Sequence, residues 1–144
     1  EQALEGMRKA KKADIDVLLS FIFGLGGRER SKEHIVETTK LLNLMKPEEI
    51  APMALTVQPA SELEAEVQAG EFVLPTPAQI LDEEKYLLEH LGDFDTFYWG
   101  DHSNNIVPQK GWLQSSRDIF LSRVNNAIEY DPVVKQDELI TYAW

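Results

Sequence analysis

Three glycines within four residues form the part of this sequence best suited to bind a ligand through its backbone. Gly24, Gly26 and Gly27, called the glycine junction below, follow an apolar run over residues 15–23. Because glycine has no Cβ, the chain can turn sharply there and another group can approach the backbone closely. An apolar run without polar alternation is typical of a strand buried on both faces. The junction would then lie at the carboxyl end of the strand, where ligands bind in α/β folds.

The glycine junction admits two interpretations. The simpler one is a tight strand-to-helix turn, and the functional one is close approach of the backbone to a nucleoside. A phosphate-binding loop is disfavoured, because neither G-x-G-x-x-G nor G-x-x-x-x-G-K occurs here. Ser20 and Ile22 fall on one face of the preceding strand, where Ser20 would either face a ligand or fill the core.

A second polar group extends from Asp101 to Asn105, in a turn-forming segment that includes His102. Such side chains can contact a substrate, but they can equally bond to their own backbone in Asx-type turns. A metal site would need further ligands nearby. Because His34 and His90 are distant in the sequence, we expect no metal here.

The remaining titratable groups predict no catalysis. Glu48-Glu49 and Glu83-Glu84 are expected to be solvated acids rather than an acid/base pair, and His34 is expected to be structural or exposed. No serine has a G-x-S-x-G setting, so hydrolase chemistry has no support. The chain has no cysteine, which excludes disulfides, thiolate nucleophiles and cysteine-held iron–sulfur clusters from it.

The elements that would position these groups alternate in type. Hydrophobic periodicity predicts helices over residues 2–12 and 32–46, the second capped by Ser31, and strands over 15–23 and 50–57. This alternation favours parallel strands joined by right-handed crossovers, and therefore an α/β fold. Downstream, capping and stop signals predict mainly helices, with one short strand. These later elements are helices over 61–70, 77–91 and 116–130 and a strand over 94–99.

The glycine junction resembles a late barrel strand of radical S-adenosylmethionine enzymes. In that superfamily the pattern Ile-x-Gly-x-(Pro/Gly)-Gly-Glu carries backbone that packs on the adenine of S-adenosylmethionine. Here Ile22 to Gly27 follow the pattern, while Arg28 stands at the position of the acid and Glu29 comes one residue later. The segment from Pro59 onward is similar to the one after the next strand in the elongator-protein-3/methylthiotransferase-like branch. Residues 101–111 are similar to an Asp-His-x-x-Asn-x-x-Pro-x-x-Gly block in uncharacterised members.

The resemblance implies a C-terminal fragment of a (β/α) partial TIM-type barrel followed by a mostly helical extension. Residues 1–58 would be late βα units of the barrel, and residues 59–144 would be the extension. The parent protein would hold a 4Fe–4S cluster on a Cys-x3-Cys-x2-Cys loop and cleave S-adenosylmethionine to a 5′-deoxyadenosyl radical. Since this sequence lacks that loop, we expect the chain alone to be inactive and to hold neither cofactor.

The resemblance also implies roles for particular residues, none of them catalytic. The implied cofactor-binding residues are Ser20, Ile22, Gly24, Gly26 and Gly27. The implied substrate contacts are His102 and Asn105. The implied partner is the N-terminal half of the same protein, which would supply the cluster.

Charge and composition limit the other possibilities. The chain has 25 acidic and 14 basic residues, and its net charge of −11 disfavours a general nucleic-acid surface. No apolar stretch is long enough to span a membrane and residues 1–12 do not resemble a signal peptide, so we expect a cytoplasmic protein without a membrane partner. The alternative function is a non-catalytic, acidic α/β interaction or scaffold domain. Exposed strand edges would also pair copies of the chain into a homo-oligomer.

Overall fold

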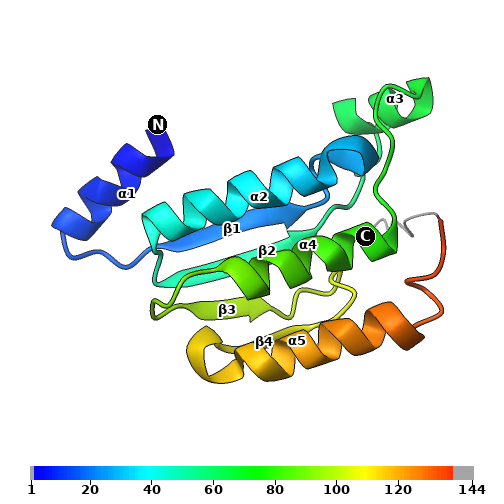
Figure 1. Ribbon diagram of the computed structural model, residues 1–144. Coiled ribbons are helices and arrows are strands. Elements are labelled where there is room, and N and C mark those ends of the chain that lie inside the picture. The colour runs from blue at the N-terminus through cyan, green and yellow to red at the C-terminus, as the bar shows by residue number, and fades with distance from the viewer. Residues whose placement is uncertain (1, 138–144) are drawn as a thin grey trace.

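Residues 2–137, which a computed structural model describes, form a four-stranded mixed sheet with helices packed against it (Figure 1). The strands are β1 (Leu18–Phe23), β2 (Glu49–Ala54), β3 (Phe97–Gly100) and β4 (Gln109–Trp112). The helices are α1 (Gln2–Lys12), α2 (Gly27–Met45), α3 (Glu62–Ala69), α4 (Pro77–His90) and α5 (Leu113–Tyr130). The expected α/β class is therefore confirmed.

Each successive strand of the chain is added to the same side of the growing sheet. Its order is β1-β2-β3-β4, with β1, β2 and β3 parallel and β4 antiparallel to β3. The connection through α2 and the connection through α3 and α4 each advance by one strand in the same direction. Connections of one hand that advance this way place their helices on the same face of the sheet. Accordingly, α2, α4 and α5 lie side by side on one face (Figure 1).

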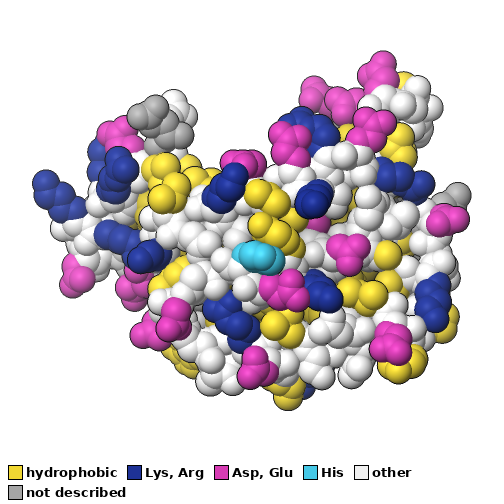
Figure 2. All heavy atoms as spheres, in the orientation of Figure 1, with side chains coloured by type: hydrophobic (Ala, Val, Ile, Leu, Met, Phe, Trp, Pro, Cys, Tyr) yellow, Lys and Arg dark blue, Asp and Glu magenta, His cyan; other side chains and the backbone are white. Residues whose placement is uncertain are grey.

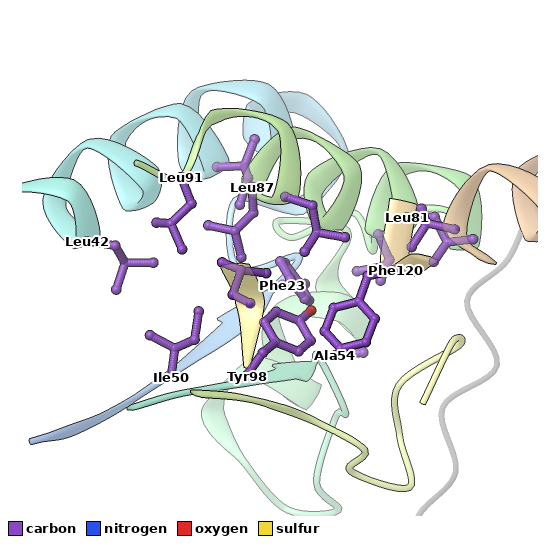
Figure 3. Packing of buried hydrophobic residues seen from close by; sticks show 14 of the residues in the cluster. Phe23, Leu42, Ile50, Ala54, Leu81, Leu87, Leu91, Tyr98 and Phe120 are labelled. Atoms are coloured by element: carbon purple, nitrogen blue, oxygen red, sulfur yellow. The ribbon is translucent and has the colours of Figure 1, made fainter. Parts of the chain in front are cut away.

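The core fills the space between the sheet and these three helices. Alternate side chains of β1, ending with Phe23, point into it, and Ile50 and Tyr98 from the neighbouring strands are fully buried beside them (Figure 3). From the helix side, α4 contributes Leu87 and Leu88, which are also inaccessible to solvent. Each such side chain contributes roughly 1.5–3 kcal/mol by leaving water, so this layer holds α4 firmly against the sheet.

The opposite side of the sheet, called the open face below, remains partly accessible. Its residues are Leu18, Ser20, Ile22, Glu49, Ala51, Met53, Phe97, Trp99, Lys110 and Trp112. Leu18 is 48% exposed and Trp112 is 55% exposed. Within residues 2–137, β1 pairs only with β2 and the packed helices cover one face of the sheet, so the expectation that the first strand is buried on both faces is wrong.

Several element boundaries differ from the sequence-based expectation. Helix α2 begins at Gly27 with Gly26 as its N-cap, so Ser31 is not a cap but a buried residue within the helix. Strand β1 begins only at Leu18, and β2 already ends at Ala54. The predicted C-terminal extension also contributes β3 and β4 to the same sheet as β1 and β2. Long-range packing, which is invisible in local sequence, sets each of these boundaries.

Helices with clear capping signals follow the prediction. Ser61 accepts the N–H of Glu64 at the start of α3, and Gly70 ends that helix with a φ of 74°. Thr76 and Gln79 form a complete capping box at the start of α4. These local hydrogen bonds need no distant partner, which explains why the sequence alone predicts them.

The surface over the helices carries charges of both signs. Figure 2 shows acidic and basic side chains interspersed there, with acidic ones gathered around α3, whose first turn contains Glu62 and Glu64. No helix within residues 2–137 is long and apolar enough to cross a membrane. Among the residues that the structure describes, this face therefore presents no continuous basic surface.

Candidate functional site

The carboxyl ends of the three parallel strands meet at one edge of the sheet, called the carboxyl edge below. Strand β1 ends at Phe23, immediately before the glycine junction, and the Leu55 N–H donates to the Phe23 carbonyl at 3.0 Å. Strand β3 ends at Gly100, and the loop after it brings Asn105 to the last residues of β2. The fold thus places the glycine junction and the predicted substrate-contact loop at the same edge.

Two glycines of the junction adopt backbone conformations that other residues rarely adopt. The φ angle is 89° at Gly24 and 61° at Gly27. A Cβ at Gly24 would lie 2.6 Å from the Ile80 Cδ1, and a Cβ at Gly27 would lie 3.0 Å from the Val73 carbonyl oxygen. The atoms that approach these glycines most closely therefore belong to the protein itself, on α4 and on the segment before it.

A buried carboxylate on α4 fixes the glycine junction. Glu83 is 1% exposed, and its Oε2 accepts the Gly24 N–H at 2.8 Å. Its Oε1 accepts the Ser31 hydroxyl at 2.5 Å, and His34 Nδ1 lies 3.2 Å from Oε2. These contacts join the end of β1, the first turns of α2 and the middle of α4. Hydrogen bonds to both carboxylate oxygens offset the cost of burying the charge.

The expectation that Glu83 is solvated is wrong. Glu83 follows Ile80 by three residues and precedes Leu87 by four, a spacing that places all three on the core side of α4. The hydrogen-bond partners of Glu83 lie 52 and 59 residues away in the sequence, so no local pattern reveals them. By contrast, Glu48 and Glu49 are half-buried near the start of β2.

The neighbouring Glu84 is also buried, again contrary to expectation. Its Oε1 accepts the Tyr98 hydroxyl at 2.8 Å and the Gln109 Nε2–H at 3.0 Å. Burial raises the pKa of Glu84 above its usual 4.5, although both hydrogen bonds act in the opposite direction. Burial also raises the pKa of Tyr98, and the nearby Glu84 carboxylate raises it further. Helix α4 therefore carries two buried acids, one bound to the β1 end and one to β3 and β4.

Asn105 joins the ends of β2 and β3. Its Oδ1 accepts the Ala54 N–H at 2.8 Å, and its Nδ2 donates to the carbonyls of Pro52 at 3.0 Å and Gly100 at 2.9 Å. Both amide hydrogens and the carbonyl oxygen are thus engaged with backbone. This arrangement anchors the loop after β3, while the substrate contact suggested for Asn105 remains a prediction.

The other predicted site residues lie on the open face of β1 and on the loop after β3. Ser20 is exposed and Ile22 is half-buried on the open face of β1, as the strand approaches the carboxyl edge. His102 is exposed on the loop after β3, where its Nδ1 lies 2.6 Å from the Asn104 Oδ1. The side chains of Ser20, Ile22 and His102 remain accessible to a ligand, whereas Gly24 is buried.

A pocket of about 170 Å³ opens at the carboxyl edge. The end of β2, the loop after β3, the start of α4 and the turn after α5 form its walls. Its polar lining residues include Thr56, Asn104 and Asp131. No local pattern in the sequence indicates Thr56 or Asp131 as site residues, because only the fold brings these distant segments together.

Neither a metal site nor a relative identifies the function. No group of three or more His, Cys, Asp or Glu side chains within residues 2–137 is arranged to hold a metal ion. Comparisons with known protein families, curated proteins and solved structures found no significant match to the chain. The open face and the carboxyl edge are the two parts of the described structure that bring together the residues predicted to bind a ligand.

Removing the Glu83 carboxylate should destabilise the fold. We expect Glu83→Ala to lower the free energy of unfolding by about 2–4 kcal/mol, because the Gly24 N–H and the Ser31 hydroxyl lose their acceptor while buried. Urea denaturation measures this loss, and hydrogen exchange at the Gly24 amide should accelerate. The control is Glu89→Ala on the exposed side of α4. Equal stability of the two variants would refute the role given to Glu83.

The buried Glu84 predicts a specific dependence of stability on pH. Because the pKa of Glu84 is higher in the folded protein, the folded state binds its proton more tightly than the unfolded chain does. Its contribution to stability is present below the usual pKa of 4.5 and is lost as the pH rises through the raised value. We therefore expect the stability of Glu84→Gln relative to wild type to increase as the pH rises from 4.5 through the raised pKa of Glu84.

Urea titrations at a series of pH values measure this difference between Glu84→Gln and wild type. Glu89→Gln, on the exposed side of the same helix, should track wild type throughout. A difference for Glu84→Gln that stays constant with pH, or that changes with the opposite sign, would contradict the burial argument.

Proposed function

We propose that this chain supplies late βα units and the C-terminal extension of a radical S-adenosylmethionine enzyme. Residues 1–58 would belong to its (β/α) barrel, and the segment predicted as the extension, residues 59–144, would add β3 and β4 to the same sheet. In the parent enzyme, a 4Fe–4S cluster supplies the electron that cleaves S-adenosylmethionine to a 5′-deoxyadenosyl radical. The observation that carries the proposal is the open face of a sheet wound in one direction.

A half-covered parallel sheet favours a barrel. Parallel sheets occur almost only where both faces are covered. A sheet whose helices all lie on one side can cover the other side by curling, so that its inner face meets the inner faces of further strands. Here β1 to β3 advance in one direction, and the open face carries apolar side chains such as Leu18, Ile22 and Met53. Such side chains suit the interior of a barrel.

The position of α1 agrees with this interpretation. Met7 of α1 is 5% exposed, and the helix packs beside α2 near the β1 side of the sheet (Figure 1). In a barrel the outer helices pack beside one another, each between successive strands. Helix α1 would then belong to the preceding βα unit. The outer edge of β1, which pairs only with β2 within residues 2–137, would take the preceding parallel strand.

In this proposal the predicted cofactor residues divide into two kinds. Ser20, in the middle of β1, and Ile22, one residue before its end, would form part of the adenine wall, because their side chains lie on the open face. Gly24, Gly26 and Gly27 would fix the strand-to-helix turn, since Gly24 and Gly27 already pack against the protein itself. The cofactor would thus contact the end of β1 rather than a loop of free glycine backbone.

The cluster itself does not fit on this chain. The sequence has no cysteine, and the described part of the chain has no group of side chains arranged for a metal. Its ligands would come from the N-terminal half of the parent protein. On the substrate side, Asn105 would position the loop after β3, and His102 would offer an accessible imidazole.

A bulky side chain on the open face tests the proposal. Ser20→Arg in the full parent protein, reconstituted anaerobically with iron and sulfide, should weaken binding of S-adenosylmethionine at least about tenfold, because the side chain would fill the adenine site. Equilibrium binding and formation of 5′-deoxyadenosine after reduction provide the measurements. Ser122→Arg, at an exposed position of α5, should leave both unchanged.

Two results would overturn the proposal. The first is a parent protein that has no Cys-x3-Cys-x2-Cys loop and forms no cluster. The second is equal binding of S-adenosylmethionine by Ser20→Arg and Ser122→Arg. In the second case the protein could still be a radical enzyme, but β1 would not line its cofactor site.

A non-catalytic, acidic interaction or scaffold domain is the second candidate. The exposed side chains of Leu18 and Trp112 on the open face favour it, because large exposed apolar groups that lie together often mark interaction surfaces. On this reading a second copy of the chain would pair with the free edge of β1.

Both candidates predict self-association of the chain when it is studied alone. Analytical ultracentrifugation should detect a dimer whose population rises with concentration. Leu18→Lys on the edge strand should weaken it, because the charge opposes strand pairing, whereas Ile119→Lys on α5 should not. The two replaced side chains are matched in exposure, at 48% and 52%. A strict monomer at high concentration would contradict the exposed-edge argument.

A further inference from the structure

The pocket at the carboxyl edge contains one charged lining side chain, Asp131. Asp131 is half-buried and directly follows α5, and its Oδ1 accepts the Val133 N–H at 2.8 Å. The described part of the chain offers this carboxylate no ion pair. One carboxylate oxygen therefore holds the local turn, while the negative charge has no protein counterion within residues 2–137.

The rest of the lining is uncharged. Its apolar side chains are Ala54, Leu55, Pro77, Ile106 and Val133. Thr56 Oγ1 accepts the Asn104 Nδ2–H at 3.3 Å, which leaves the hydroxyl oxygen with a second acceptor position. Ser103 adds another hydroxyl. A small pocket with an apolar wall, acceptor oxygens and one unpaired carboxylate has the polarity needed to bind an organic cation.

Two helix ends also act on this pocket. Helix α5 ends at Tyr130, next to Asp131, and the partial negative charge of its last turn favours a cation. Helix α4 begins at Pro77 and carries the opposite partial charge, but Thr76 already binds the Gln79 N–H there. Because these partial charges are each about half a unit and oppose one another, the full charge of Asp131 decides the sign.

We propose that this pocket binds a small primary ammonium ion with a short aliphatic body. The ammonium group lies against the free oxygen of Asp131 and the hydroxyl of Thr56, and the aliphatic part contacts Leu55 and Ile106. The volume of about 170 Å³ is below the range typical of drug-sized ligands, so the ligand is small. The inference concerns this chain alone and does not depend on the proposed radical chemistry.

A titration of the isolated chain with n-propylammonium chloride tests this inference. Two-dimensional amide NMR should show saturable shifts at residues 55–56, 103–106 and 131–133. The isosteric 1-propanol should bind at least tenfold more weakly. Asp131→Asn should weaken propylammonium binding at least tenfold, because asparagine keeps the acceptor for the Val133 N–H but removes the charge. Asp118→Asn, at an exposed position of α5, is the matched control.

The inference is wrong if propylammonium produces no saturable shifts at these residues. It is also wrong if 1-propanol binds as tightly, or if Asp131→Asn and Asp118→Asn bind propylammonium equally well. The spectra of Asp131→Asn show directly whether the turn and the surrounding fold are preserved. Failure here leaves the radical-enzyme proposal unaffected, since that proposal is tested on the parent protein through S-adenosylmethionine.

Discussion

The carboxylate of Glu83, buried in the middle of α4, is the interaction on which the carboxyl edge of this fold depends. It binds the Gly24 N–H in the strand-to-helix turn and the Ser31 hydroxyl within α2, which lie 59 and 52 residues earlier in the chain. A buried carboxylate is tolerated only when hydrogen-bond donors contact it, so the turn after β1 and helix α4 must keep their relative position.

Helix α4 connects both halves of the sheet. Glu83 holds the end of β1, and Glu84 binds Tyr98 on β3 and Gln109 on β4. With α2 and α5 on either side of it, α4 closes one face of the sheet and leaves the other accessible. The open face near Ser20 and the carboxyl edge beside Asn105 are consequently both accessible to a ligand.

Local signals in the sequence predict those parts of the fold that need no distant partner. The capping residues Ser61 and Thr76 predict the starts of α3 and α4, and the alternation of helix and strand predicts the α/β class. Prediction fails where a distant partner decides. Ser31 has the chemistry of a cap, yet it donates to Glu83 from within α2. Glu83 and Glu84 have the chemistry of surface acids, and only the tertiary fold supplies the donors that bury them.

The candidate site shows the same division. The glycine junction is visible in the sequence because glycine spacing is a local feature, whereas the pocket beside Asp131 depends on segments that only the fold brings together. The most direct test of the central claim is an anaerobic structure of the parent protein with S-adenosylmethionine bound. Our account predicts a barrel that continues the sheet beyond β1, with the adenine against Ser20 and Ile22. An open face covered by another protein surface, with no cofactor beside β1, would contradict it.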